Sequence, residues 1–227
     1  MKIGLLGSGK TGGEILHLCP KEQVVAFNTS NVMTAEKLSD IDVVIAFVPG
    51  DILLQYTPLL IEAKIPVVSG ATGFEWPAET RSDVANRSLR WISGSNFSLG
   101  MRIVHQMIKK LNHAKKIFDD SSFHIHEVHH TKKLDAPSGT AKSWDSWVDN
   151  VATISHERTG DVVGDHQIDL ITEFEKISLR HQALDRKIFA KGALWAAKYL
   201  IENSENINPG IHLFEDVTEK IINDQEK

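Results

Sequence analysis

Short apolar runs alternate with helix-like segments along the first hundred residues of the chain. Five runs have the length and apolar composition of buried strands, at residues 3–6, 24–27, 43–47, 67–69 and 89–92. Between them, one helix is predicted from the turn Pro49-Gly50-Asp51 through Ala63, and another over residues 75–86. Strands that alternate with helices predict a parallel sheet covered on both faces.

A second domain is predicted beyond residue 112, where strand-like stretches become dominant. They lie at residues 122–128, 162–170 and 173–179, with one helix over residues 138–151. This combination suggests a mixed sheet.

Two apolar helices flank that second domain. Apolar residues recur at helical spacing from Leu99 to Leu111 after Ser98, a plausible cap, so this helix is expected to lead out of the first domain. The other helix covers residues 188–201 and is followed by the breaker Asn208-Pro209-Gly210 and a polar tail.

Composition and charge narrow the class of protein. With 227 residues, 41% hydrophobic and 24% charged, the chain is expected to be globular. A net charge of −5 argues against a general affinity for nucleic acid, and no apolar run reaches the roughly 18 residues of a membrane helix. The first residues lack a signal-peptide pattern, so a cytoplasmic location is expected. The single cysteine, Cys19, excludes an internal disulfide and is expected to be a packed thiol.

A glycine-rich loop, Gly7-Ser8-Gly9-Lys10-Thr11-Gly12, stands between the first predicted strand and a predicted helix. In that context the spacing predicts a dinucleotide site, because glycines let the backbone approach a pyrophosphate and the helix presents free N–H groups. The alternative is a tight turn that binds nothing. A kinase-type phosphate loop is excluded because that motif needs four residues between its glycines, whereas only Ser8 stands between Gly7 and Gly9.

The end of the second predicted strand bears on the choice of coenzyme. An acidic residue usually stands there to bind the adenosine ribose, but this chain has Asn28-Thr29-Ser30-Asn31. Without a carboxylate to repel the 2′-phosphate, NADPH is favoured and NADH remains possible. Lys10 is a candidate for the cation that would meet the phosphate.

The segment from Glu127 to Ala141 concentrates basic and titratable side chains before a helix start. A strand that ends near Val128 would place Glu127 and His129 on one face and His130 on the other, before the loop brings Lys133 back. Pro137-Ser138-Gly139-Thr140 then exposes backbone N–H groups at a helix N-terminus, which suits a carboxylate.

Two other interpretations of this segment remain open. His124 and His126 share a strand face and, with Glu127, His129 and His130, have residue types that bind zinc, although no further Cys or His has a standard metal spacing. Alternatively, the segment is a polar strand end with solvated lysines. No metal is expected.

The segment Glu127-Val128-His129-His130 through Lys133 to Ala141 closely resembles the signature of the 4-hydroxy-tetrahydrodipicolinate reductase family, formerly dihydrodipicolinate reductase. Similar segments extend over nearly the whole chain: the glycine loop, Gly70-Ala71-Thr72-Gly73-Phe74, Ser95-Asn96-Phe97-Ser98-Leu99-Gly100, and the stretches at 158–166 and 185–193.

The resemblance implies a Rossmann-type, doubly wound α/β domain with an inserted α+β domain. Residues 1–97 with 187–227 would bind the dinucleotide, and residues 98–186 would bind the substrate, a small dicarboxylate, and assemble a homotetramer, with hinges near Asn96 and Arg186.

The resemblance also implies roles for single residues. His129 would transfer a proton, Lys133 would donate one, and His130, Gly139 and Thr140 would bind the substrate. The coenzyme would be bound by the glycine loop and by two further groups: Gly70, Ala71 and Thr72, and Gly94, Ser95, Asn96 and Phe97.

Four departures from the family pattern stand out. Ala71 and Ser95 are mild substitutions. The acidic residue after the second strand is missing, which bears on coenzyme preference. The chain is also shorter between Asn150 and Arg158, so the assembly could differ.

The implied chemistry agrees with these residues, because hydride addition to a conjugated cyclic imine gives an enamine that must be protonated on carbon. His129 and Lys133 are both candidates for the acid. Two rivals are another Rossmann oxidoreductase, such as an aspartate or homoserine dehydrogenase, and a nucleotide-sensing protein without turnover.

Overall fold

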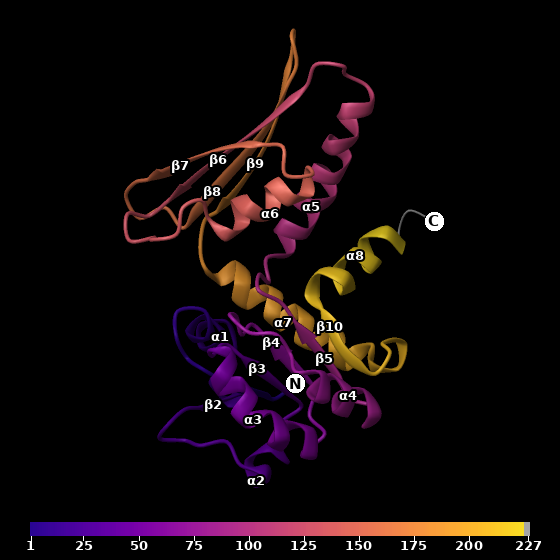
Figure 1. The fold of residues 1–227 in the computed structure, drawn as a ribbon. Helices are drawn as coiled ribbons and strands as arrows, with labels where there is room; N and C mark the ends of the chain where they lie inside the picture. The colour runs from indigo at the N-terminus through magenta and orange to yellow at the C-terminus, as the bar shows by residue number, and fades with distance from the viewer. Residues whose placement is uncertain (225–227) are drawn as a thin grey trace. The chain divides into compact units, whose positions relative to one another are not determined.

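The computed structural model describes residues 1–224 and divides the chain into two compact units (Figure 1). The first unit comprises Met1–Ser98 and the chain from Arg186 onward, and the second comprises Leu99–Asp185. The first unit is therefore built from two stretches of chain with the second unit inserted between them.

The first unit contains a six-stranded parallel sheet in the order β10-β5-β4-β3-β1-β2. Its strands are β1 (Ile3–Leu6), β2 (Val24–Phe27), β3 (Val43–Ala46), β4 (Val67–Ser69), β5 (Arg90–Ser93) and β10 (Gly210–Leu213). The five strands predicted in the first hundred residues are confirmed to within one residue at each end.

Helices cover both faces of this sheet, as predicted for a doubly wound fold. They are α1 (Gly12–Leu18), α2 (Ala35–Leu38), α3 (Gly50–Glu62), α4 (Ala78–Asn86), α7 (Lys187–Glu202) and α8 (Phe214–Asp224), with 3-10 turns η1 (Lys21–Gln23) and η3 (Ser204–Asn206). Leu53 and Leu60 of α3 pack in one core with Val44. Ile15 of α1 and Ala193 of α7 pack in a second core with Ile45. Neighbouring residues of one strand thus face opposite cores.

The polar tail predicted after Pro209 is wrong. Residues 210–213 form β10, which pairs with β5 so that Ile211 lies opposite Trp91, and α8 follows. Four residues are too few to show a strand period, so the neighbouring strand determines this element.

The second unit is a mixed four-stranded sheet in the order β7-β6-β8-β9, with two helices packed on one face (Figure 1). Its strands are β6 (Ser122–His129), β7 (Thr153–Arg158), β8 (Gly164–Ile171) and β9 (Lys176–Ala183), and its helices are α5 (Leu99–Asn112), the 3-10 turn η2 (His113–Lys116) and α6 (Gly139–Trp147). Strands β6 and β7 are parallel, whereas the other pairs are antiparallel. The core between sheet and helices contains Ile108, Phe123, Trp144 and Ile168.

Three details of this unit differ from the prediction. The strand expected over residues 173–179 is β9, Lys176–Ala183, because residues 172–175 form the turn between β8 and β9. Strand β7 was missed because its residues are mostly polar and none is fully buried. The helix expected over residues 138–151 ends at Trp147, because Asp149 and Asn150 adopt left-handed backbone angles, with φ of 65° and 58°.

Within the described part of the chain, none of the helices has both the length and the apolarity required to cross a bilayer.

Candidate active site

The glycine loop after β1 has a backbone that side chains would disrupt. Gly7 has a φ of +91°, and a Cβ atom on Gly12 would lie 1.9 Å from the carbonyl oxygen of Gly7. A Cβ on Gly9 would meet no atom within 4 Å. The loop therefore needs Gly7 and Gly12 for its own conformation, whereas Gly9 leaves open space for a ligand.

A cavity of about 540 Å³ adjoins this loop within the first unit. Its wall consists of loop residues at the carboxyl ends of β1, β3, β4 and β5 together with one residue of α7: Gly9, Lys10, Thr11, Gly12, Phe47, Val48, Pro49, Gly70, Thr72, Ser95, Asn96, Phe97 and Phe189. Open parallel sheets bind their ligands at this edge.

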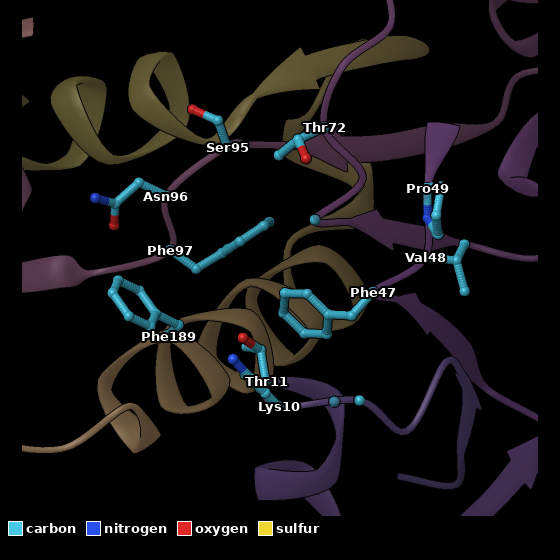
Figure 2. A pocket seen from close by; sticks show the side chains of 13 residues that line it. Lys10, Thr11, Phe47, Val48, Pro49, Thr72, Ser95, Asn96, Phe97 and Phe189 are labelled. Carbon is cyan, nitrogen blue, oxygen red and sulfur yellow. The ribbon is translucent and has the colours of Figure 1, made fainter. Parts of the chain in front are cut away.

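Polar and aromatic groups lie on different parts of the cavity wall (Figure 2). Thr72, Ser95 and Asn96 lie on one side, Lys10 and Thr11 lie on the other, and aromatic rings lie between them. The Phe47 and Phe97 rings meet edge to face, with centroids 6.1 Å apart. Such a wall offers hydrogen bonds at its two sides and flat apolar surface between them.

The structure places nine of the thirteen predicted coenzyme residues on this wall. The other four, Gly7, Ser8, Ala71 and Gly94, do not line it. Sequence reasoning missed Phe47, Val48 and Pro49, although the end of the third strand was a signal for them. It also missed Phe189, which comes from a distant part of the chain and carried no signal.

The loop after β2 is organised by the Asn28 side chain. Its Oδ1 accepts hydrogen bonds from the backbone N–H groups of Ser30 and Asn31, both at 2.9 Å. Lys37 of α2 donates to Asn31 Oδ1 at 2.8 Å and to the Val32 carbonyl at 2.9 Å. The cation beside this loop is therefore Lys37, whereas Lys10, the residue considered from the sequence, lies on the cavity wall.

A second group of predicted site residues lies in the second unit, around the buried carboxylate of Glu127. Its side chain is 0% exposed. Glu127 Oε1 accepts hydrogen bonds from the Ser138 backbone N–H at 3.1 Å and from Arg158 Nη2 at 2.9 Å. Its Oε2 pairs with His129 Nδ1. Glu127 and His129 share the covered face of β6, as their spacing predicts.

Burial and charge set the protonation of these groups. Burial raises the pKa of Glu127, but hydrogen bonds from Arg158, His129 and Ser138 outweigh it and hold this pKa below its usual value. Burial lowers the pKa of His129, and the Glu127 charge opposes only part of that effect. His129 is therefore mainly neutral near pH 7 while Glu127 is charged.

Lys133 lies in the loop that follows β6. Its Nζ donates to both carboxylate oxygens of Asp135, at 2.7 and 2.9 Å. The backbone carbonyl of Asp135 accepts a hydrogen bond from Arg158 Nη2 at 2.7 Å. Arg158 thus links the Lys133 loop to Glu127, a role that sequence reasoning missed because 31 residues separate the two partners.

Ser138 fixes the start of α6, where Gly139 is exposed and Thr140 half-buried. Its Oγ accepts from the Ala141 N–H at 3.1 Å and lies 3.1 Å from His166 Nε2. Through Glu127, Ser138 and Arg158, the structure brings His129, Lys133 and this helix start together. His130 follows directly on β6, with its N–H bonded to the Val162 carbonyl.

The residues considered for zinc are divided between the two faces of the sheet. His126 Nδ1 and His124 Nε2 both meet Ser155 Oγ, at 2.8 and 2.9 Å, on the face away from Glu127. A different set, Glu127, His129 and His166, has candidate ligand atoms within 4.8 Å of one another. Glu127 already pairs with His129 Nδ1 through one oxygen and with the Arg158 cation through the other, whereas His166 Nδ1 has no hydrogen-bond partner in the described part of the chain. A metal ion would have to displace the Arg158 cation from the carboxylate, which disfavours this set as a metal site.

Protonation of His166 is expected to destabilise the second unit. Burial lowers the pKa of His166 to about 3 from 6.5, so the unfolded chain binds a proton between these pH values that the folded chain does not. His166 should therefore make the free energy of unfolding fall as pH drops below about 6.5, and this single group contributes at most roughly 1.4 kcal/mol per pH unit. The urea concentration at the midpoint of unfolding, compared at pH 7 and pH 5, measures this loss of stability. His166→Gln should reduce the loss, and an unchanged loss would contradict the assignment.

Comparison with known proteins gives consistent results. The family model "Dihydrodipicolinate reductase, C-terminus" matches residues 100–217. The 4-hydroxy-tetrahydrodipicolinate reductase of Bdellovibrio bacteriovorus is 33% identical, with 96% of each chain covered. That of Haloarcula marismortui is 31% identical, over 86% of this chain and 90% of the relative.

A solved structure has the same fold. Dihydrodipicolinate reductase from Paenisporosarcina sp. TG-14, determined with dipicolinate bound, superposes with a TM-score of 0.72 and 21% sequence identity. The alignment covers 96% of this chain and 99% of the other.

Proposed function

This chain belongs to the 4-hydroxy-tetrahydrodipicolinate reductase family of lysine and diaminopimelate biosynthesis, and we propose that its two groups of residues bind the coenzyme and the substrate of that reduction. Residues 1–97 with 187–227 bind the dinucleotide, and residues 98–186 bind the dicarboxylate. The observation that carries this assignment is that the buried Glu127 pairs with His129, accepts the Ser138 N–H at the start of α6, and is linked through Arg158 to the loop that carries Lys133.

The cavity beside the glycine loop fits a dinucleotide. Gly9 leaves open space where a pyrophosphate would approach, and the cavity of about 540 Å³ is large enough to hold part of the coenzyme. When bound, the coenzyme supplies a hydride. Thr72, Ser95 and Asn96 offer hydrogen bonds on one side of the cavity, and Phe47 and Phe97 exclude water from its middle.

The group of residues around Glu127 in the second unit fits a dicarboxylate. Lys133, His130 and the N–H groups of Gly139 and Thr140 offer donors for its two carboxylates. A substrate carboxylate competes with Asp135 for the Lys133 ammonium, so binding exchanges one ion pair for another. The dipicolinate in the Paenisporosarcina relative supports a ligand of this class.

The product lacks the hydroxyl group of the substrate, so the reaction releases water and consumes a hydride and a proton. Loss of that hydroxyl as water first gives a conjugated cyclic imine, and addition of the hydride to it leaves an enamine that must be protonated on carbon. We assign this step to Lys133, because His129 is mainly neutral near pH 7. His129 then serves through its Nε2 atom as a hydrogen-bond acceptor beside the ring.

NADPH is proposed as the preferred coenzyme, with NADH also used. The loop after β2 carries no carboxylate, and Thr29 and Ser30 offer hydroxyl groups. Lys37 adds an ammonium group whose two described acceptors, Asn31 Oδ1 and the Val32 carbonyl, are uncharged. Its positive charge can therefore act on a 2′-phosphate.

Lys37→Gln is expected to lower kcat/KM for NADPH by about tenfold and to leave that for NADH nearly unchanged, because one charge-assisted hydrogen bond is lost. Thr29→Asp should shift preference further towards NADH by repelling the phosphate. Lys21→Gln, which removes an exposed lysine from the same unit, is the matched control. Equal losses with both coenzymes would refute the role of Lys37.

Self-association as a homotetramer in the cytoplasm is also proposed. In the second unit, α5 and α6 pack on the same face of the sheet (Figure 1). The opposite face presents His126, Gln167 and Arg180, which no helix of the described unit covers. Sedimentation analysis of the full chain tests the tetramer, and a monomer would refute it.

The reaction itself is tested by nicotinamide oxidation with freshly generated 4-hydroxy-tetrahydrodipicolinate. We expect substrate-dependent oxidation of NADPH and formation of tetrahydrodipicolinate. Coenzyme binding without any turnover would refute the proposed reaction.

A further inference from the structure

Glu127 connects two parts of the proposed substrate site through its two oxygen atoms. Oε2 meets Nδ1 of His129, whereas Oε1 accepts the backbone N–H of Ser138, the residue directly before Gly139. We propose that Glu127 is the positioning residue of this site, which fixes the tautomer of His129 and holds the start of α6 beside it. The kinetic consequences of this inference rest on the proposed function.

The carboxylate is charged at a position where burial opposes charge. The side chain is fully buried, and the Arg158 guanidinium at 2.9 Å neutralises it. A buried ion pair is seldom the most stable choice for a core, because removing two charges from water offsets much of their attraction. A carboxylate here is therefore better explained by what it does to its neighbours than by stability.

The first consequence concerns the protons on His129. Ionised Glu127 can only accept hydrogen bonds, so neutral His129 must carry its proton on Nδ1. Its Nε2 atom is then unprotonated and available as an acceptor. This arrangement matches the role of hydrogen-bond acceptor that is proposed for His129.

The second consequence concerns the anion-binding turn. Ser138 is 2% exposed and is held at its backbone N–H by Glu127 and at its Oγ by His166 and Ala141. These bonds fix the backbone from which the N–H groups of Gly139 and Thr140 project. Glu127 thus sets the position of the carboxylate-binding groups relative to His129.

Replacing Glu127 by glutamine separates this role from simple hydrogen bonding. The carbonyl oxygen of the introduced amide can still accept from Ser138 and Arg158, which both donate to the same oxygen of Glu127. The amide NH₂ group then faces His129 Nδ1 and must donate to it. His129 is forced into the Nε2-protonated tautomer, and its acceptor atom is lost.

The experiment begins with the unmodified full-length protein. Long-range ¹H–¹⁵N NMR at neutral pH reports which nitrogen of each histidine carries the proton, and His129→Asn identifies the His129 signals among the eleven histidines. We expect the Nδ1-protonated form. A His129 with its proton on Nε2 would overturn the proposal, and this measurement requires neither substrate nor a Glu127 variant.

The Glu127→Gln variant provides the kinetic test. We expect the tautomer to reverse, kcat to fall by roughly a hundredfold, and KM for the dicarboxylate and Kd for NADPH to remain within about twofold. The NADPH measurement reports the integrity of the first unit. Asp145→Asn is the matched control, since Asp145 is a half-buried carboxylate of the same unit that accepts the Ala152 N–H at 3.0 Å and does not contact His129.

The outcomes are distinguishable. Glu127→Gln with an unchanged tautomer or with kcat near that of Asp145→Asn would overturn the positioning role. An unmodified protein without turnover would count against the proposed reaction, whereas the His129 tautomer would still decide what Glu127 does.

Discussion

Lys133→Ala is expected to lower kcat by roughly 100- to 10,000-fold, the range typical for removal of a general acid. Lys133 is held by Asp135 next to the start of α6, where a substrate carboxylate would arrive. NADPH affinity should be unaffected, because the cavity proposed for the dinucleotide is formed entirely by the first unit. Steady-state kinetics and direct NADPH titration measure the two quantities separately.

Lys132→Ala is the matched control for this prediction. Lys132 is the neighbouring lysine of the same loop and is exposed. Replacing either lysine by alanine changes the net charge of the protein by the same amount. A loss of kcat shared by both variants would indicate a general effect of charge. A Lys133→Ala enzyme with unchanged kcat would remove Lys133 from the site and leave His129 as the proton donor.

The parallel sheet could be predicted because each of its first five strands is an apolar run that differs sharply from its surroundings. Strand β3 illustrates this, since Val43–Ala46 is fully buried between two helical layers and has no polar residue. Strands β7 and β10 lack such contrast. The sequence of β7, Thr153–Arg158, is polar and partly exposed, and its pairing with β6 depends on residues some thirty positions away.

The candidate site shows the same division between local and distant information. His129, Lys133 and Gly139 stand in one short segment, so their spacing was informative before any fold was known. Arg158 acts through a contact with Glu127, 31 residues away, that is made only after folding. Lys37 is only six residues from Asn31, but the loop between them has no regular period that would show the contact in the sequence. Local patterns do not identify such partners, because the sheet register and the helix placement bring them together.

The coenzyme loop provides the other large effect that we expect. Gly12→Val should weaken NADPH binding by at least about 100-fold, or about 2.8 kcal/mol. The Cβ of any side chain at this position would lie 1.9 Å from the Gly7 carbonyl oxygen, so the loop must change its path. The backbone at Gly7 is packed so closely against Phe47 that a Cβ there would lie 2.5 Å from the Phe47 carbonyl oxygen, so the loop has little room to shift. Fluorescence titration with NADPH measures the loss, and circular dichroism checks that the fold remains.

Variants of two neighbouring glycines distinguish distortion of the loop from direct obstruction of the ligand. A Cβ on Gly9 meets no protein atom within 4 Å, so Gly9→Ala should leave the loop intact and weaken NADPH only by intruding where the pyrophosphate approaches. A Cβ on Gly13 lies 3.4 Å from the Ser8 carbonyl oxygen, an ordinary contact, and Gly13→Ala is expected to bind NADPH nearly as the unmodified protein does. A folded Gly12→Val protein that binds NADPH normally would show that the coenzyme does not depend on this loop.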